Sequence, residues 1–288
     1  MANRTSPTVR RRRLAAELKR LRKESGKTRE EVADFVSCAP ATITKIESAA
    51  TSAPPAYVAR MLELYGVDGQ EKDAWLTVAK QARKRGWWQQ YNDAIPNWFT
   101  VYVGLEEEAG KIREYECEII PGLFQTEAYI RGLMDVELAL PGDEELERRI
   151  AVRLKRQELL TADDAPHLWV VLNEAALRRE VGGRAVMGDQ LRHLVEVSRL
   201  NTVTLQVLPF GAGAHPAMQH GFFILGFAEP LDPDVVYVEY RTGSLYLEQQ
   251  SEVAAYGLIF DHLRAKALAP DDSRTLIKKI AEQMEHQE

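Results

Sequence analysis

The chain has 288 residues, a length typical of two domains, and a formal net charge of −6 at pH 7. Its two cysteines, Cys38 and Cys117, lie far apart and form neither a disulfide framework nor a zinc-ligand spacing, which favours a reducing cytoplasm. No apolar run is long enough to cross a membrane, and the first thirteen residues, MANRTSPTVRRRR, lack the apolar segment of a signal peptide.

The charge is divided unequally along the chain. Residues 1–86 hold 18 Lys and Arg against 10 Asp and Glu, a net of +8, whereas residues 87–288 hold 19 against 33, a net of −14. A basic N-terminal region is attracted to DNA phosphates, while an acidic C-terminal region is repelled. The densest basic run is Arg10, Arg11, Arg12 and Arg13, which forms either a flexible arm along the DNA backbone or the exposed start of a first helix.

The N-terminal region has the apolar spacing of a small helical domain. Leu14, Leu18 and Leu21 form one stripe, which predicts a helix over residues 10–24. Further stripes follow Pro54-Pro55 and surround Trp75. Five short helices in about eighty residues can bury one small core, so we predict an all-helical domain here.

Residues 28–48 predict two short helices joined by a tight turn. Thr28 and Glu31 have the spacing of a capping box, which starts a helix that carries Val32 and Val36 on one face. Residues 37–40, SCAP, cannot continue that helix smoothly, and Pro40 suits the first turn of the next helix. This arrangement is a helix-turn-helix, whose second helix enters a DNA major groove.

At these residues the chain resembles the Xre (lambda-repressor-like) family. Ala33 stands at the family's small site, and its apolar sites are taken by Val32, Val36, Cys38, Ile43 and Ile46. The resemblance implies that Glu47 pairs with an arginine of the first helix, for which Arg22 is the expected partner. The chain departs from the family pattern where Ser37 and Ala49 stand in place of glycine, and where Arg29 and Pro40 stand in place of glutamine.

The second helix of the motif is predicted to span residues 40–48 and to read DNA. Because Ile43 and Ile46 face the core, the outward positions are Ala41, Thr42, Thr44 and Lys45. We expect the last three to contact bases or phosphates. Arg29, in the first turn of the preceding helix, is expected to contact a phosphate, as are Arg10 to Arg13.

An aromatic segment begins the C-terminal region. Residues 87–102 hold three of the five tryptophans, together with Tyr91, Phe99 and Tyr102. Such a density favours packing of one domain on the other; the alternative is a base-stacking or ligand-binding surface. The acidic neighbourhood disfavours nucleic acid.

The remaining pattern mixes helices and strands. Helices are predicted over 105–131 with a break at Pro121-Gly122, and over 144–161, 189–198, 261–267 and 273–284. Strands are predicted over 167–172, 203–208, 221–227 and 235–240, with a hairpin closed by 243–247. The prediction is therefore a multidomain protein, with an all-α lambda-repressor-like domain at 1–86 and a larger α/β or α+β domain at 87–288 that binds an effector or partner.

This region also resembles a known group. Residues 86–131, from GWWQQY to AYIR, and 203–227, from VTLQVL to ILGF, are similar to the module after the Xre domain in WhiJ-like antitoxin-type bacterial transcriptional regulators. The resemblance implies control of development or secondary metabolism, with a small protein partner from a neighbouring gene.

Catalysis is the weaker interpretation. His215 and His220 flank the Gly-rich residues 211–214, and Glu174, Glu239 and Glu248 lie on or near predicted strands. However, the chain has no HExxH, GxSxG or Walker motif. The two histidines are expected to be loop residues and Glu174 to pair with Arg178 or Arg179. Carboxylates and histidines around a pocket would still suit a small cationic or peptide ligand.

These observations predict a DNA-binding transcriptional regulator without a cofactor or metal. It would bind a double-stranded operator as a homodimer, since one such domain makes few base contacts. Its C-terminal domain would sense a small-molecule effector or bind a small protein partner. The alternative is an antitoxin-like protein that sequesters that partner and regulates its own operon. A third hypothesis is an enzyme fused to a DNA-binding domain, but the sequence contains none of the catalytic motifs considered above.

Overall fold

The computed structural model describes residues 7–83, 86–136, 142–227 and 233–285. The chain forms two compact units, one ending at Gln89 and the other beginning at Gln90, which we call the head and the body. The sequence placed this border three residues earlier, at Gly86. No helix in the described ranges combines the length and the apolar character needed to span a membrane.

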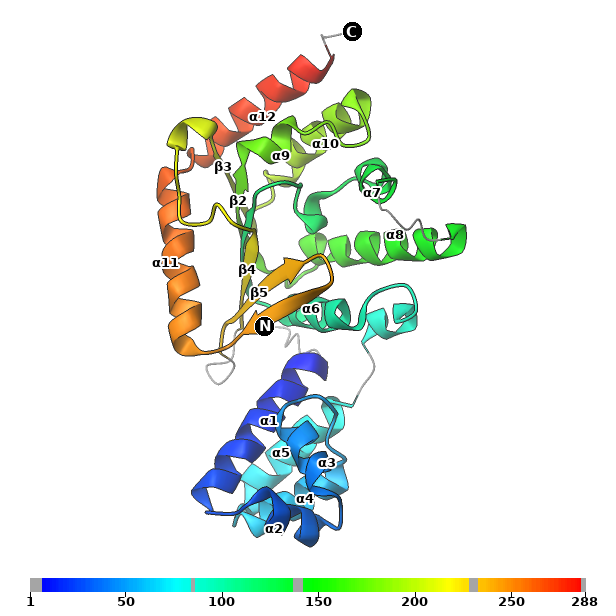
Figure 1. The fold of residues 1–288 in the computed structure, drawn as a ribbon, viewed down its shortest axis with the longest axis vertical. Helices are drawn as coiled ribbons and strands as arrows, with labels where there is room; N and C mark the ends of the chain where they lie inside the picture. The colour runs from blue at the N-terminus through cyan, green and yellow to red at the C-terminus, as the bar shows by residue number, and fades with distance from the viewer. Residues whose placement is uncertain (1–6, 84–85, 137–141, 228–232, 286–288) are drawn as a thin grey trace. The chain divides into compact units, whose positions relative to one another are not determined.

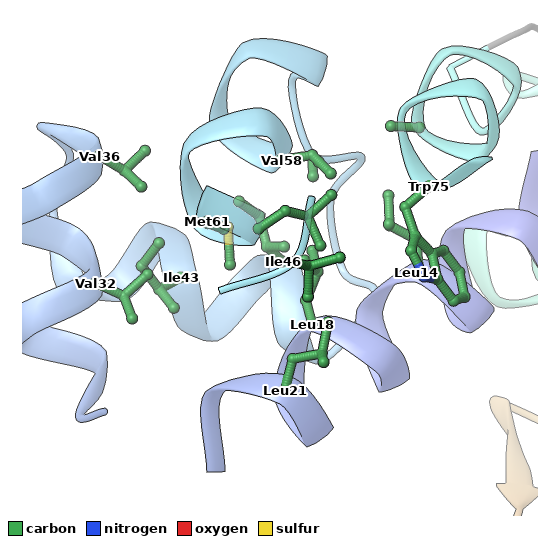
Figure 2. Close-up of a cluster of buried hydrophobic side chains, with 14 of the residues drawn as sticks. Leu14, Leu18, Leu21, Val32, Val36, Ile43, Ile46, Val58, Met61 and Trp75 are labelled. Carbon is green, nitrogen blue, oxygen red and sulfur yellow. The ribbon is translucent and has the colours of Figure 1, made fainter. Parts of the chain in front are cut away.

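The described part of the head is helical. Its helices are α1 (Pro7–Glu24), α2 (Arg29–Val36), α3 (Pro40–Glu47), α4 (Pro55–Leu64) and α5 (Gly69–Gln81). Figure 2 shows their apolar side chains meeting in one core, with Leu18 of α1, Ile46 of α3 and Met61 of α4 fully buried or nearly so. The predicted helical domain and its apolar stripes are confirmed.

The turn between α2 and α3 has the predicted chemistry. Thr28 accepts a hydrogen bond from the Glu31 backbone N–H, and the Glu31 carboxylate accepts one from the Thr28 N–H, so the capping box is present. Ser37 ends α2 with φ 64° and ψ 52°, and Ala49 follows α3 with φ 56°. Both residues are in the left-handed region that favours glycine. These are the two positions where the Xre-type pattern has glycine.

The body is built on a six-stranded mixed sheet with the order β3-β2-β1-β4-β5-β6. β1, β2 and β3 are parallel, and β4, β5 and β6 are antiparallel to their neighbours. The strands are β1 (Lys111–Glu116), β2 (His167–Asn173), β3 (Val203–Leu208), β4 (Phe222–Gly226), β5 (Val235–Tyr240) and β6 (Gly243–Leu247). The predicted mixed fold is confirmed, including the closing hairpin.

Helices cover both faces of this sheet (Figure 1). On one face lies α11 (Gln250–Lys266), where Phe260 and Leu263 pack with Tyr115, Phe222 and Val236. The other face is covered by α6 (Asn97–Glu108) and α8 (Asp143–Gln157). The remaining elements are η1 (Trp87–Tyr91), η2 (Gly122–Phe124), α7 (Glu127–Met134), η3 (Glu158–Thr161), α9 (Glu174–Arg178), α10 (Arg184–Val197), η4 (Phe210–Ala212) and α12 (Pro270–Glu285).

The sequence prediction was wrong over residues 105–131. Instead of a broken helix, this stretch holds the end of α6, the central strand β1, η2 and the start of α7. β1 reads KIREYE, and its apolar Ile112 and Tyr115 stand three residues apart, as on a helix. Strands flanked on both sides and covered on both faces are usually almost wholly apolar, so Glu114 and Glu116 concealed this one. The helix predicted over 261–267 also begins earlier, at Gln250.

Candidate DNA-binding surface and ligand pocket

The outward face of α3 is polar and lies as the sequence predicted. Ile43 and Ile46 are buried in the head core, whereas Ala41, Thr44 and Lys45 are exposed and Thr42 is half-buried. The Thr44 hydroxyl donates to the Pro40 carbonyl oxygen at 3.3 Å, within the helix. This face offers short side chains and one cation, which are suited to close approach to base edges.

Glu47, the last residue of α3, connects three helices. Its side chain is 1% exposed and accepts from Arg22 of α1, with Nε–Oε1 at 2.5 Å and Nη2–Oε2 at 3.1 Å. Arg29 Nε of α2 donates to Oε2 at 2.9 Å. Burial opposes ionisation of Glu47, but the hydrogen bonds from Arg22 and Arg29 outweigh it, so its pKa is lowered. The Arg22–Glu47 pair implied by the Xre resemblance is present.

Arg29 has a role that the sequence did not predict. We expected it only to contact a phosphate, yet its Nε is bonded to Glu47 while the side chain stays 39% exposed. The guanidinium therefore helps hold α2 and α3 together and still reaches the surface. The missed signal was the acidic residue at the end of α3, which has room for two donors.

The run from Arg10 to Arg13 lies in α1, so it is helical rather than a flexible arm, but the four side chains are half-buried and not exposed as predicted. Arg13 lies over the Trp75 ring of α5, with its guanidinium carbon 5.6 Å from the centroid. Arg22, which reaches Glu47, is nine residues further along the same helix, or about 14 Å along its axis. The structure thus does not bring Arg13 together with the α3 face.

The body contains a pocket of about 630 Å³ on the α6 and α8 side of the sheet. Aromatic side chains of α6 and β4 line it, with carboxylates from the sheet and arginines from α8. Its principal lining residues are Trp98, Phe99, Tyr102, Glu116, Glu118, Gln125, Arg149, Arg153, Arg156, Gly221, Phe223 and Glu239. Three aromatics of the predicted border segment, Trp98, Phe99 and Tyr102, therefore line a pocket of the body.

Two carboxylates of this pocket stand in one row across the sheet. β1 pairs Tyr115 with Phe222, and β4 pairs Phe223 with Tyr237. Continued by one residue from the first pair and by two residues from the second, these registers put Gly221 between Glu116 and Glu239, on the face opposite Tyr115. Because Gly221 has no side chain, the Glu116 carboxylate can lie over it, on the side of Glu239. A Cβ there would lie 2.9 Å from Glu116 Oε2.

The electrostatics of this row favour a proton or a cation. Burial, and next the charge of Glu239, raise the pKa of Glu116 to about 8. Glu239 accepts from the Tyr237 hydroxyl at 2.9 Å. Glu114 precedes Glu116 by two residues on β1 and lies on the same face of the sheet. It is 2% exposed, and its Oε1 has no hydrogen-bond partner within the described ranges. Burial also raises the pKa of Glu114 well above its ordinary value.

Three arginines of the pocket, all from α8, are already engaged, and Arg241 also lines it. Arg156 donates from Nε and Nη2 to the two Glu106 oxygens, each at 2.7 Å, and both residues are buried. Arg149 donates to Glu145 at 2.6 Å, and Arg153 to the Gln125 amide oxygen at 3.1 Å. Arg156 also lies over the Phe99 ring at 5.0 Å, so it is part of the pocket wall rather than a free cation.

The residues weighed for catalysis do not converge. Glu174 pairs with Arg178, as predicted, and accepts from the Phe210 N–H. His215 lies 3.4 Å from the Tyr115 hydroxyl, on the α11 face, whereas Glu239 lines the pocket on the other face. No cluster of three His, Cys, Asp or Glu suited to a metal occurs among the residues that the structure describes.

Two family models match the sequence. One, described as a helix-turn-helix domain, matches residues 13–75 and so covers α2 and α3. The other, described as a domain of unknown function (DUF5753), matches residues 99–279. No curated protein and no solved structure matches the chain. The chain therefore belongs to the DUF5753 family, and its helix-turn-helix domain is that of a DNA-binding regulator.

Proposed function

We propose that this protein is a sequence-specific transcriptional regulator that reads an operator with α3 and senses a small ligand with its body. The observation that carries the first half is the α3 surface, where Thr44 and Lys45 are exposed while Glu47 is held by Arg22 and Arg29. A helix held rigidly at its C-terminal end presents its outer side chains in one geometry, as base readout requires. The resemblance to Xre-type domains and WhiJ-like regulators supports this proposal.

The proposed operator is read by a homodimer. A single helix-turn-helix places one short helix in the groove, which gives few base contacts and limited affinity. Two copies would bind half-sites about 34 Å apart, one turn of the duplex. The operator should then contain two related half-sites with that spacing.

The body supports ligand sensing more directly than capture of a protein partner. Its pocket of about 630 Å³ lies in the range typical of small-molecule sites, roughly 300–1,000 Å³. Its walls combine aromatic rings with a few polar groups, as such sites do. An antitoxin-like role with a small protein partner remains the second candidate, supported by the sequence resemblance.

The experiment that tests this proposal is selection of duplexes from a random library by the full chain. We expect enrichment of one motif made of two half-sites, bound by a dimer in light scattering. Retention of random DNA without an enriched motif would contradict sequence-specific regulation. If the chain instead purifies with a small protein encoded nearby, and that protein blocks the pocket, the result would favour the antitoxin-like role.

A further inference from the structure

We infer that the body pocket binds a small organic ammonium ion, with its cationic end between Glu116 and Glu239 and its apolar part against the aromatic wall. This inference rests on the proposal that the body senses a small ligand, and it names the chemical class of that ligand. Three features of the pocket carry it: the geometry of the carboxylate row, the state of the surrounding charges and the aromatic lining.

The carboxylate row offers two acceptors on the same face of the sheet. Glu116 and Glu239 stand two strands apart, which separates their backbones by about 9.6 Å. Gly221 lies between them and contributes no side chain. An ammonium group at this row can donate to both carboxylates, and such charge-assisted hydrogen bonds are stronger than neutral ones.

Arginines also line this pocket, among them Arg153 and Arg241, but the carboxylate row has no ion-pair partner in the described ranges. In the described part of the chain, no salt bridge joins Glu116 or Glu239 to a lysine or arginine. Glu118, by contrast, is paired with Arg179, and Arg156 is taken by Glu106. Glu116 is half-buried and Glu239 is exposed; two neighbouring carboxylates with no cation repel each other, and a bound ammonium would relieve that repulsion.

The aromatic wall suits the rest of such a ligand. Trp98 and Phe99 meet edge to face with centroids 6.0 Å apart, and Phe99 stacks on Tyr102 at 5.5 Å. Phe223 meets Tyr102 at 5.3 Å and stands one row along the sheet from Gly221. These rings offer an apolar surface next to the carboxylates, and Arg156 already lies over Phe99 and Tyr102.

Competing ligand classes fit the pocket less well. An anion would be repelled by the carboxylate row, and Arg149 and Arg156 are already paired with glutamates, so only Arg153 and Arg241 of the lining arginines would oppose that repulsion. A neutral ligand would leave that row unpaired. The pocket thus discriminates by charge as well as by shape.

The test uses isothermal titration of the full chain at pH 8.5 with three probes of similar shape: phenethylamine, 2-phenylethanol and 3-phenylpropanoate. We expect the amine to bind at least about tenfold more tightly than the alcohol, and the carboxylate not to bind, as charge-assisted contacts imply. Glu116→Gln and Glu239→Gln should each weaken amine binding by about tenfold or more. Both changes keep the side-chain shape, so the fold should survive, which circular dichroism checks.

Glu196→Gln is the matched control, because it removes an exposed carboxylate that is paired with Arg199 and does not line the pocket. It should change amine binding less than about twofold, because that carboxylate is not part of the carboxylate row. Equal binding of amine and alcohol, no binding of the amine, or an equal loss in Glu196→Gln would overturn the inference. No DNA is present in this titration, so its outcome is independent of the operator selection that tests the proposed function.

Discussion

Arg22 and Glu47 form a two-point ion pair between α1 and α3, 25 residues apart in sequence, with the shorter N–O distance at 2.5 Å. The Glu47 side chain is 1% exposed and that of Arg22 is 11% exposed, so neither charge can turn to water if the other is removed. The pair therefore fixes the C-terminal end of α3 to α1 within the head.

Removal of the Glu47 carboxylate should destabilise the head. We expect Glu47→Ala to lower the free energy of unfolding by about 3 kcal/mol, because it leaves the Arg22 charge buried without a partner. Glu24→Ala breaks an exposed pair with Arg20 and should cost less than about 0.5 kcal/mol. Urea denaturation of the full chain measures both, and similar losses in the two variants would refute the structural role of Glu47.

Arg29 should contribute to binding of any duplex. Its guanidinium is partly exposed and stands in the first turn of α2, where a phosphate is favoured. Arg29→Ala should weaken binding to operator and random DNA alike, and should reduce the slope of log affinity against log salt by about one. Fluorescence anisotropy over a salt series measures this. A loss of sequence preference with an unchanged slope would instead make Arg29 a base reader.

The two left-handed residues offer a gain in stability. Ser37 and Ala49 have φ of 64° and 56°, where a Cβ is unfavourable. Ser37→Gly and Ala49→Gly should each raise the free energy of unfolding by about 0.5–1 kcal/mol. Ala50 has no positive φ, so Ala50→Gly is the control and should be neutral or destabilising. Thermal unfolding of the three variants compares them, and a loss at Ser37 or Ala49 would argue against strain there.

The stability of the body should fall as pH rises through neutrality. An unfolded glutamate titrates near 4.3, whereas burial and then Glu239 raise the pKa of folded Glu116 to about 8. Between these values the folded state binds more protons than the unfolded state, so the free energy of unfolding decreases by up to about 1.4 kcal/mol per pH unit. Buried Glu114 acts in the same direction.

Glu116→Gln should remove its share of this pH dependence and leave the share of Glu114. Urea midpoints at pH 5.5, 6.5 and 7.5 measure the slope in both proteins. A parallel slope in the variant would show that Glu116 titrates normally.

The head was predictable from sequence because its information is local. The capping box at Thr28, the buried Ile43 and Ile46, and the turn at Ser37 each depend on residues within a few positions of one another. The partner of Glu47 followed from the family resemblance. Its second partner, Arg29, required the crossing of α2 and α3, which spacing alone does not give.

The pocket could not be predicted, because it depends on register between distant strands. Glu116 and Glu239 are 123 positions apart in the chain, and only the order β1-β4-β5 puts them on either side of Gly221. Glu239 was singled out from sequence, but Glu116 was missed because KIREYE resembles an exposed helix. A strand with two inward carboxylates breaks the apolar pattern at the place where the structure forms a pocket.

The central claim, that α3 reads DNA through its exposed face, is tested most directly by the affinities of Thr44→Ala and Lys45→Ala for the selected operator and for random duplex. Each variant should lose about 1–3 kcal/mol of operator affinity per base contact removed and little affinity for random DNA, apart from a phosphate share at Lys45. Lys80→Ala removes an exposed lysine from α5, outside the helix-turn-helix, and serves as the charge-matched control. Operator affinity unchanged in both α3 variants, or reduced equally by Lys80→Ala, would contradict the account.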